Sequence, residues 1–260
     1  MNHNLLKGKN GLILGIIDYD SIAYHVALQC IKEGANIIIS NNKQAIKYGF
    51  ITKISKDLSI PIIEADLTNY TNVEKLINNT LKLFNSKIDF ILHSVGISYN
   101  IRKKNDYIKH NLDYYFNTLN VSSLSLHRIL SVCFQKDAIS CWGSVVTLTY
   151  YGSKKVLPEY NDMGDAKSLL ESIVRNFGYY YGVNKRVRIN AISQSPVITK
   201  SSIKINNFNT IVKNSNSKSP LGNANSDMCA KYCVTLFSDY TRMVTMQTLF
   251  HDGGFSSMII

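Results

Sequence analysis

Long hydrophobic runs are missing from this 260-residue sequence. No stretch approaches the roughly 18 uninterrupted apolar residues that a membrane-spanning helix requires. The start of the chain, MNHNLLKGK, also lacks the apolar stretch of a secretory signal peptide. We therefore expect a cytoplasmic protein that does not insert into a membrane.

Cysteine spacings typical of metal sites and disulfide frameworks are lacking as well. The five cysteines are an odd number, and only Cys229 and Cys233 lie one helical turn apart. Histidines at ligand spacing do not accompany them, which excludes the usual zinc patterns. The sequence predicts buried free thiols and no bound metal.

Acidic residues are few, with 18 Asp and Glu against 29 Lys and Arg, so the net charge is +11. The lysines are scattered through Asn- and Ile-rich sequence and do not form the single basic stripe of a nucleic-acid-binding protein. We therefore expect no nucleic-acid partner. A basic surface would instead favour the approach of an acidic protein.

Short apolar runs alternate with segments of helical periodicity along the chain. The runs predict strands at residues 10–15, 36–40, 60–65, 88–93, 144–149, 187–192 and 247–251. Helices are expected at 21–34, 43–58, from about 72, and at 111–135 and 227–238. This alternation indicates an α/β fold, a single Rossmann-like doubly wound domain over residues 1–260 whose seven-stranded parallel sheet has helices on both faces. The polar residues 99–110 are expected to form a loop or lid, and 199–219 a mobile lid over the substrate.

The helix after the first strand is placed to bind a dinucleotide. Ser21 is a natural N-cap, Gly34 is placed to end the helix, and a helix N-terminus can bind a pyrophosphate through backbone N–H groups. The usual three-glycine fingerprint is absent, since only Gly15 remains. The second strand continues into Asn41 and Asn42 without the acid that would repel a 2′-phosphate, so the choice between NADH and NADPH stays open.

Two tyrosines and a lysine follow the fifth expected strand. Lys167 comes seven residues after Tyr160, close to two turns of a helix, and this spacing predicts both side chains on one helix face. A lysine charge there would lower the pKa of the phenol. The alternative is a surface helix on which Tyr160 and Lys167 are incidental.

Together these motifs resemble the short-chain dehydrogenase/reductase superfamily, and within it the divergent enoyl-acyl carrier protein reductases of bacterial fatty-acid synthesis. Ordinary members have Tyr and Lys four residues apart, whereas here the interval is seven and the fourth strand runs into His93-Ser94-Val95-Gly96. The resemblance covers nearly the whole chain. Its other motifs are Gly15 with Ser21-Ile22-Ala23, Thr147 to Tyr150, Pro158 to Asn161 with Met163 and Gly164, Ala191 to Ser193, Pro196, Thr199, Ser219 to Gly222, and Asp252 to Gly254.

The resemblance implies a set of site residues. Catalytic roles fall on Tyr150, Tyr160 and Lys167, and substrate contacts on Ser98 and Tyr150. The implied cofactor is NADH, with NADPH not excluded. Its expected contacts are Gly15, Ser21, Ile22, Asn42, Asp66, Leu67, Ser94, Val95, Gly96, Lys167, Pro196, Val197 and Thr199.

The implied reaction is reduction of the trans-2 double bond of an enoyl thioester. A hydride adds to C3, Tyr160 stabilises or protonates the enolate, Lys167 holds the nicotinamide ribose, and Tyr150 closes the pocket unless it is an aromatic packed at a strand end. A second hypothesis is a carbonyl (3-oxoacyl) reductase, which the tyrosine spacing disfavours. A third is an inactive nucleotide-binding scaffold.

The family implies two partners. One is an acyl carrier protein, which is acidic, with Arg102, Lys103, Lys200 and Lys204 as candidate contacts. The other is the chain itself, in a homotetramer.

Two acids depart from the small apolar residues usual in the family, Asp162 and Asp165. Acids in the first turn of a helix are favoured by its dipole, which is one explanation. If either carboxylate instead faced the pocket, it would compete for Lys167 or raise the pKa of Tyr160.

Overall fold

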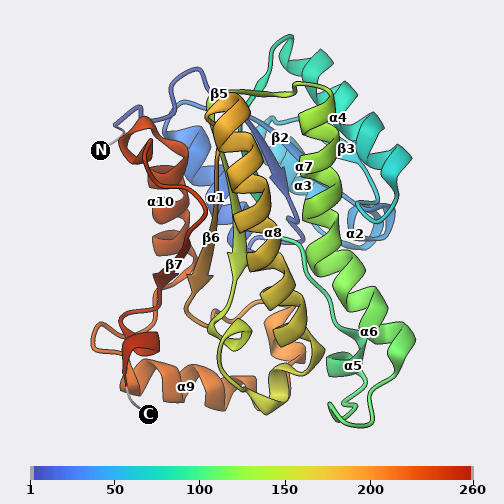
Figure 1. Ribbon diagram of the computed structural model, residues 1–260, viewed down its shortest axis with the longest axis vertical. Helices are drawn as coiled ribbons and strands as arrows, with labels where there is room; N and C mark the ends of the chain where they lie inside the picture. The colour runs from blue at the N-terminus through green and yellow to red at the C-terminus, as the bar shows by residue number, and fades with distance from the viewer. Residues whose placement is uncertain (1–2, 259–260) are drawn as a thin grey trace.

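The structure is a computed structural model that describes residues 3–258, and its strands join one parallel sheet (Figure 1). The strands are β1 (Asn10–Leu14), β2 (Asn36–Asn41), β3 (Ile62–Glu64), β4 (Ile88–His93), β5 (Ile139–Thr149), β6 (Arg188–Gln194) and β7 (Thr248–His251). Their order is β3-β2-β1-β4-β5-β6-β7, and every neighbouring pair is parallel. The predicted seven-stranded Rossmann-like sheet is confirmed.

Alternate residues of each central strand enter different cores. On β1, Leu12 and Leu14 belong to one apolar cluster and Ile13 to the other. The first cluster is covered by α4 (Tyr70–Phe84), α7 (Ser125–Gln135) and α8 (Asp162–Lys185), and the second by α1 (Ile22–Lys32) and α10 (Ser226–Phe237). Strands that are buried on both faces are rich in apolar residues, and this explains the Ile and Leu runs of β1 and β2.

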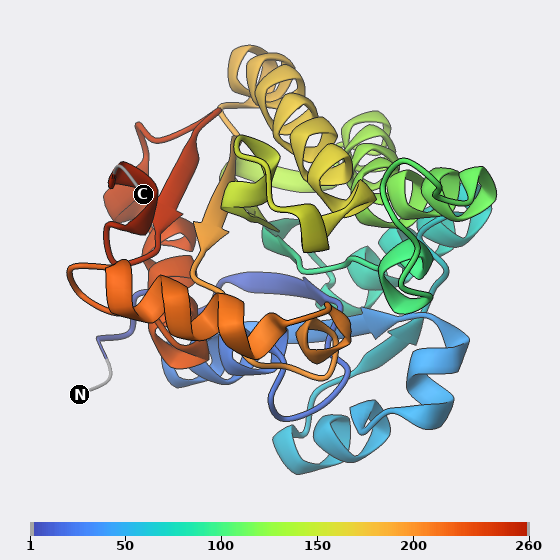
Figure 2. The same cartoon turned by 90° about the horizontal axis from the view of Figure 1, so that it is seen from below.

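Parallel strands bring all their carboxyl ends to one edge of the sheet. That edge is at the bottom of Figure 1 and faces the viewer in Figure 2. The segment after β4 carries α5 (Tyr99–Arg102), and the segment after β6 carries α9 (Phe208–Lys218). Residues 199–219 therefore contain regular structure, while their predicted role as a mobile lid stays a prediction.

The expected helix at 43–58 is wrong as a single element, because the chain breaks at Gly49. Two helices form, α2 (Lys43–Tyr48) and α3 (Ile51–Leu58). Gly49 is extended, and a Cβ there would lie 2.4 Å from the Ala45 carbonyl oxygen. The next N–H, of Phe50, donates to the Ile17 carbonyl at 3.0 Å, which ties the break to the loop after β1.

The expected long helix at 111–135 is present but changes its winding midway. It consists of α6 (Leu112–Leu119), a π-helical turn (Asn120–Leu124) and α7. The extra residue of such a turn redirects side chains, and it often occurs at functional sites. Here Ser122 accepts the N–H of Ile97 at 3.0 Å, and Ser123 donates to the carbonyl of Ala166 at 2.5 Å.

A bulge at the start of β5 exposes a thiol that the sequence analysis expected to be buried. Ile88 pairs with Ile139 and Phe90 with Ser144, so residues 140–143 lie opposite a single residue of β4. Cys141 lies in this bulge and is exposed, whereas Cys30, Cys133, Cys229 and Cys233 are buried; all five are free thiols.

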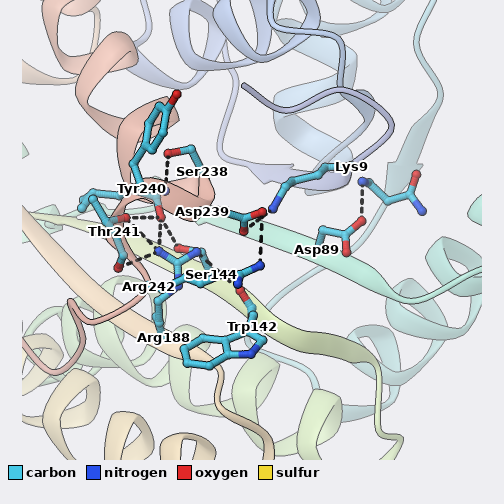
Figure 3. Close-up of polar contacts among 12 residues, drawn as sticks. Lys9, Asp89, Trp142, Ser144, Arg188, Ser238, Asp239, Tyr240, Thr241 and Arg242 are labelled. Atoms are coloured by element: carbon cyan, nitrogen blue, oxygen red, sulfur yellow. Dashed lines mark hydrogen bonds and ion pairs between the residues drawn. The ribbon is translucent and has the colours of Figure 1, made fainter. Parts of the chain in front are cut away.

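A buried arginine connects several elements at the opposite, amino-terminal edge of the sheet (Figure 3). Arg188 is 2% exposed, and its Nη1 donates to the Leu236 carbonyl at 2.8 Å and to Oγ1 and the carbonyl of Thr241 at 2.8 and 3.1 Å. Burial lowers the pKa of its guanidinium. The same Leu236 carbonyl accepts the hydroxyl of Ser144, so β5, β6 and the end of α10 meet on one hydrogen-bond network.

Replacing this arginine should destabilise the fold without affecting the carboxyl edge. Arg188→Met leaves buried carbonyl groups without their donor, and we expect a loss of about 1–3 kcal/mol in the free energy of unfolding. Urea denaturation measures it. Arg242→Met is the control, because that side chain is half exposed beside Asp239. Equal stability of the two variants would contradict the structural role given to Arg188.

Candidate active site

Tyr160 lies immediately before the helix that carries Lys167, so the predicted placement of both side chains on one helix face is wrong. Tyr160 ends a 3₁₀ turn (Pro158–Tyr160), and Asn161 follows with φ 45° and ψ −137°. The side chain of Asn161 stabilises this reversal, since its Oδ1 accepts the N–H of Asp162 at 2.6 Å. α8 then begins at Asp162.

Tyr160 packs edge to face against Tyr150. The ring centroids are 5.1 Å apart at 66°, and Tyr160 is only 8% exposed. On another side of the ring, a Cβ on Gly152 would lie 2.6 Å from Tyr160 Cδ1, so the backbone approaches more closely than any other residue would permit. The predicted pair of tyrosines is therefore brought together in a tight apolar site.

The phenol of Tyr160 is protonated at neutral pH. Burial, with a smaller contribution from Tyr150, raises its pKa well above the ordinary 10.0. Burial also raises the pKa of Tyr150 to about 12. The expected lowering of the Tyr160 pKa by Lys167 is wrong, because loss of hydration dominates and raises it. A phenol in this state can donate a hydrogen bond.

Lys167 extends from α8 toward the ends of β4 and β5. Its Nζ donates to the Leu148 carbonyl at 2.8 Å, and a Cβ added to Gly96 would lie 3.8 Å from Nζ. Burial lowers its pKa to about 8, an effect that Glu171 partly offsets. The ammonium is therefore mostly charged at neutral pH and lies beside the open backbone of Gly96.

Glu171 is a buried carboxylate that sequence analysis missed. It accepts the hydroxyls of Thr149 at 2.8 Å and Ser153 at 2.5 Å. Glu171 follows Lys167 by four residues in α8, and this spacing of about one helical turn could have predicted that the acid lies near the lysine.

The predicted cofactor residues after β1 and β4 contact one another. Gly15 has φ +100°, and a Cβ there would lie 2.1 Å from the carbonyl oxygen of Ser94 and 3.3 Å from Val95 Cγ2. The N–H of Ser94 donates to the Leu14 carbonyl at 3.1 Å. Gly15, Ser94, Val95 and Gly96 therefore form one backbone surface at the carboxyl edge.

The first turn of α1 is not capped by a side chain. Ser21 occupies the N-cap position as predicted, but its hydroxyl donates to the Asp18 carbonyl at 2.7 Å and does not accept a helix N–H. Ile22 begins the helix. This leaves the helix N-terminus for a ligand.

The predicted residues after β2, β3 and β6 also lie at the carboxyl edge. Asn42 caps α2 by accepting the N–H of Ala45 at 2.8 Å, and Asp66 accepts the N–H and hydroxyl of Thr68 at 2.9 and 2.7 Å. Leu67 and Pro196 are buried. The hydroxyl of Ser202 joins Val197 to Thr199, donating to the Val197 carbonyl at 2.7 Å and accepting the N–H of Thr199 at 2.8 Å.

Lys200 reaches across this edge to a buried acid. Its Nζ lies 3.4 Å from Asp18 Oδ2 and 4.5 Å from the centroid of the Phe50 ring. Lys200 was predicted to contact a carrier protein, but its charge is directed at Asp18 within the same chain. The two residues are far apart in sequence, and no local pattern links them.

Ser98 and the two unusual acids form hydrogen bonds with residues other than Lys167. The Ser98 hydroxyl donates to Asp162 at 2.5 Å and accepts the N–H of Ile101 at 3.0 Å. Asp165 accepts the hydroxyls of Tyr107 and Tyr115. The possibility that these acids compete for Lys167 is therefore excluded, and the substrate contact of Ser98 stays a prediction.

A cavity of about 900 Å³ opens beside the 3₁₀ turn that carries Tyr160, although neither Tyr160 nor Tyr150 lines it. It lies between residues 104–109 and 152–159, with Asn161 and Asp165 from the start of α8. Ile101 and Leu157 line it and also pack in the apolar cluster of Tyr160. Its volume suits a small-molecule ligand.

Comparison with known proteins identifies the family. A sequence model described as "Enoyl-(Acyl carrier protein) reductase" matches residues 15–256. The chain belongs to this family of reductases. It is 32% identical to the enoyl-[acyl-carrier-protein] reductase [NADH] FabI of Rickettsia prowazekii, covering 98% of this chain and 97% of that protein.

Two further enoyl reductases support the assignment. The enoyl-[acyl-carrier-protein] reductase [NADH] FabI of Buchnera aphidicola subsp. Baizongia pistaciae is 33% identical over 96% of each chain. The crystal structure of a FabI–NADH complex from Alistipes finegoldii superposes with a TM-score of 0.98 at 46% identity, covering 99% of this chain and 91% of that one. The predicted family and fold are confirmed, while the contacts of individual site residues stay predictions.

Within residues 3–258, none of the helices is both long and apolar enough to cross a membrane.

The environment of Lys167 gives a measurable titration. We expect its side-chain NMR signal to titrate near pH 8, and Lys167→Arg to assign that signal. Because Glu171 favours the charged lysine, Glu171→Gln should move the midpoint to lower pH. Glu74→Gln, which removes an acid beside Lys136, is the control and should leave the midpoint unchanged. A Lys167 midpoint that stays above 10, near the ordinary 10.5, would show that the site is not dehydrated.

Proposed function

We propose that this chain is an NADH-dependent reductase of trans-2-enoyl-acyl carrier protein thioesters in bacterial fatty-acid elongation. The observation that carries the proposal is a protonated Tyr160, held against Tyr150 near a cavity and seven residues before the charged Lys167. Membership of the family supports the proposal, and so do the names of the relatives, which specify NADH.

The residues at the carboxyl edge fit a dinucleotide. The α1 N-terminus offers backbone N–H groups to a pyrophosphate, and the positive φ of Gly15 with its close contact to Ser94 brings the loops after β1 and β4 together. The Lys167 ammonium, beside Gly96, is placed to donate to the hydroxyls of the nicotinamide ribose. When bound, NADH supplies the hydride that adds to C3 of the enoyl thioester.

Tyr160 acts on the charge that the reaction creates. Hydride addition at C3 places negative charge on the thioester oxygen, and a phenol donor aimed there stabilises it. Because its pKa is raised, the phenol is protonated when the enolate forms and can donate to the enolate oxygen. Tyr150 fixes the ring of Tyr160 by edge-to-face packing and closes the pocket.

The end of the second strand carries no acid that would exclude NADPH. β2 ends in Asn41, and Asn42 caps α2 with its side chain, so neither residue places a carboxylate near a 2′-phosphate. We propose NADH as the preferred cofactor because the relatives are named for it.

The proposed protein partner is an acidic acyl carrier protein. Arg102, Lys103 and Lys204 are exposed on the segments after β4 and β6, whereas Lys200 is engaged with Asp18. We propose that Arg102, Lys103 and Lys204 contact the carrier. We also propose that the protein acts in the cytoplasm.

A homotetramer is proposed from the exposed apolar side chains. Leu112 and Phe116 on α6, and Tyr179, Tyr180 and Val183 on α8, are each at least half exposed. Such side chains favour association between copies, and β7 adds an unpaired sheet edge.

The catalytic prediction concerns the phenol. Tyr160→Phe should lower kcat by about 100- to 1,000-fold, the usual effect of losing one such donor. NADH consumption with a trans-2-enoyl thioester measures the rate, and NADH fluorescence shows that cofactor binding is retained. Tyr181→Phe, which removes another buried hydroxyl, is the control. Wild-type protein inactive on enoyl but active on 3-oxoacyl thioesters would support the carbonyl reductase instead, and protein that does not bind NADH would support neither enzyme.

The carrier prediction concerns the exposed basic residues. Arg102→Glu with Lys103→Glu should raise KM several-fold for carrier-linked substrate at low salt, because complementary charge speeds the encounter. KM for a small thioester lacking the carrier should not change. Lys56→Glu on α3 is the control, as an exposed lysine on another part of the surface. A carrier KM that does not depend on salt would contradict this docking site.

A further inference from the structure

Asp162 is a fully buried carboxylate at the first position of α8. Its exposed fraction is 0%, and its three side-chain partners are neutral. Ser98 Oγ donates to Oδ1 at 2.5 Å, and Asn100 Nδ2 and Thr118 Oγ1 donate to Oδ2 at 2.8 and 2.9 Å. A buried charge is tolerated only with such donors, and the positive end of the helix dipole adds to their effect. The fold therefore commits three donors to a single side chain.

One of these donors closes the segment after β4. Asn100 Oδ1 accepts the side chain of Asn105 and the N–H of Asn111, both at 2.9 Å. Its Nδ2 donates to the Asn111 carbonyl at 3.1 Å as well as to Asp162. Because one amide holds both ends and the middle of residues 100–111, fixing Asn100 fixes the loop.

Two neighbours of Asp162 hold the same segment. Asn161 Nδ2 donates to the Asn105 carbonyl at 2.7 Å. Asp165 accepts the hydroxyls of Tyr107 at 2.9 Å and Tyr115 at 3.1 Å, and with burial it raises the pKa of Tyr115 to about 12. The start of α8 is therefore joined by polar contacts to five residues between 98 and 115, namely Ser98, Asn100, Asn105, Tyr107 and Tyr115.

These contacts surround Tyr160 on two sides. On one side, Asn161 is held in an unusual backbone conformation between Tyr160 and Asp162, and such conformations persist only where several contacts enforce them. On the other side, Ile101, whose N–H is bound by Ser98, packs in the apolar cluster of the Tyr160 ring. The Asp162 carboxylate accepts the Ser98 hydroxyl, and the backbone N–H of the same residue donates to the side chain of Asn161.

We propose that Asp162 is a positioning residue, whose carboxylate clamps residues 98–111 to the start of α8 and thereby fixes the Tyr160 hydroxyl and one wall of the adjoining cavity. This role rests on the proposed reductase function. The carboxylate does not touch the substrate or transfer a proton. It acts through Ser98, which binds the N–H of Ile101. It also acts through Asn100, which holds Asn105, whose carbonyl accepts the side chain of Asn161.

The test compares two variants of Asp162 with matched variants of another buried acid. Asp162→Ala removes all three acceptor contacts, whereas Asp162→Asn keeps the size and one acceptor oxygen. Glu33 is the control, because it is 3% exposed and accepts the N–H groups of His3 and Leu5 and the side chain of Gln29, near the amino-terminal edge of the sheet. kcat, KM, the Kd of NADH and the unfolding midpoint are measured for Asp162→Ala, Asp162→Asn, Glu33→Ala and Glu33→Gln.

A positioning role predicts a specific pattern. Asp162→Ala should lower kcat by roughly 10- to 100-fold, since a displacement of about 1 Å in a reacting group has effects of this size. The Kd of NADH should change less than threefold, and Asp162→Asn should recover most of kcat. Glu33→Ala should lower the unfolding midpoint without lowering kcat of the folded enzyme. The proposal is overturned if Asp162→Ala retains kcat within twofold, or if its kcat falls only in proportion to its folded fraction.

A second readout does not depend on the reaction. Hydrogen exchange of residues 98–111 should become faster in Asp162→Ala, while exchange in β1 and β4 stays the same. If the wild-type protein showed no enoyl reduction, the proposed function would fail while this exchange pattern still tested the clamp. Unchanged exchange in residues 98–111 would overturn the clamp even in an active enzyme.

Discussion

Burial of the Tyr160 phenol links the packing of this chain to its chemistry. The close backbone approach of Gly152 and the edge of Tyr150 remove water from the ring, and this dehydration keeps the proton on the phenol. The same dehydration acts in the opposite sense on Lys167, where it makes the charged form easier to lose. Burial therefore accounts for both a protonated donor and a moderated cation, which lie on adjacent stretches of chain separated by the turn at Asn161.

Buried carboxylates around this site are compensated in three different ways. Asp162 accepts hydrogen bonds from neutral donors, and Asp18 is paired with Lys200. Glu171 accepts two hydroxyls, and its charge raises the pKa of Lys167. None of these carboxylates forms an ion pair with Lys167. The ammonium consequently remains available for a ligand, and the acids act on the shape of the site and on the pKa of the lysine.

Sequence patterns predicted the sheet because a strand buried on both faces is largely apolar, as in residues 12–14 and 37–39. They also predicted which loops meet, since parallel strands end at one edge. They missed features that depend on a single backbone conformation. The break at Gly49, the bulge at residues 140–143 and the reversal at Asn161 are set by hydrogen bonds to distant segments. The pairing of Lys200 with Asp18 is likewise a tertiary contact with no local spacing to reveal it.

The bulge in β5 has a practical consequence. Burial raises the pKa of the thiols of Cys30 and Cys133. A hydrogen bond with Cys229, together with burial, raises the pKa of the Cys233 thiol. All three thiols therefore stay protonated and enclosed. Cys141 alone among the five cysteines is exposed, at the end of β5 opposite Thr149 and the tyrosines. The unmodified chain thus carries one natural attachment point for a thiol-reactive fluorophore or surface linker. A reporter fixed there would leave the catalytic edge facing solution.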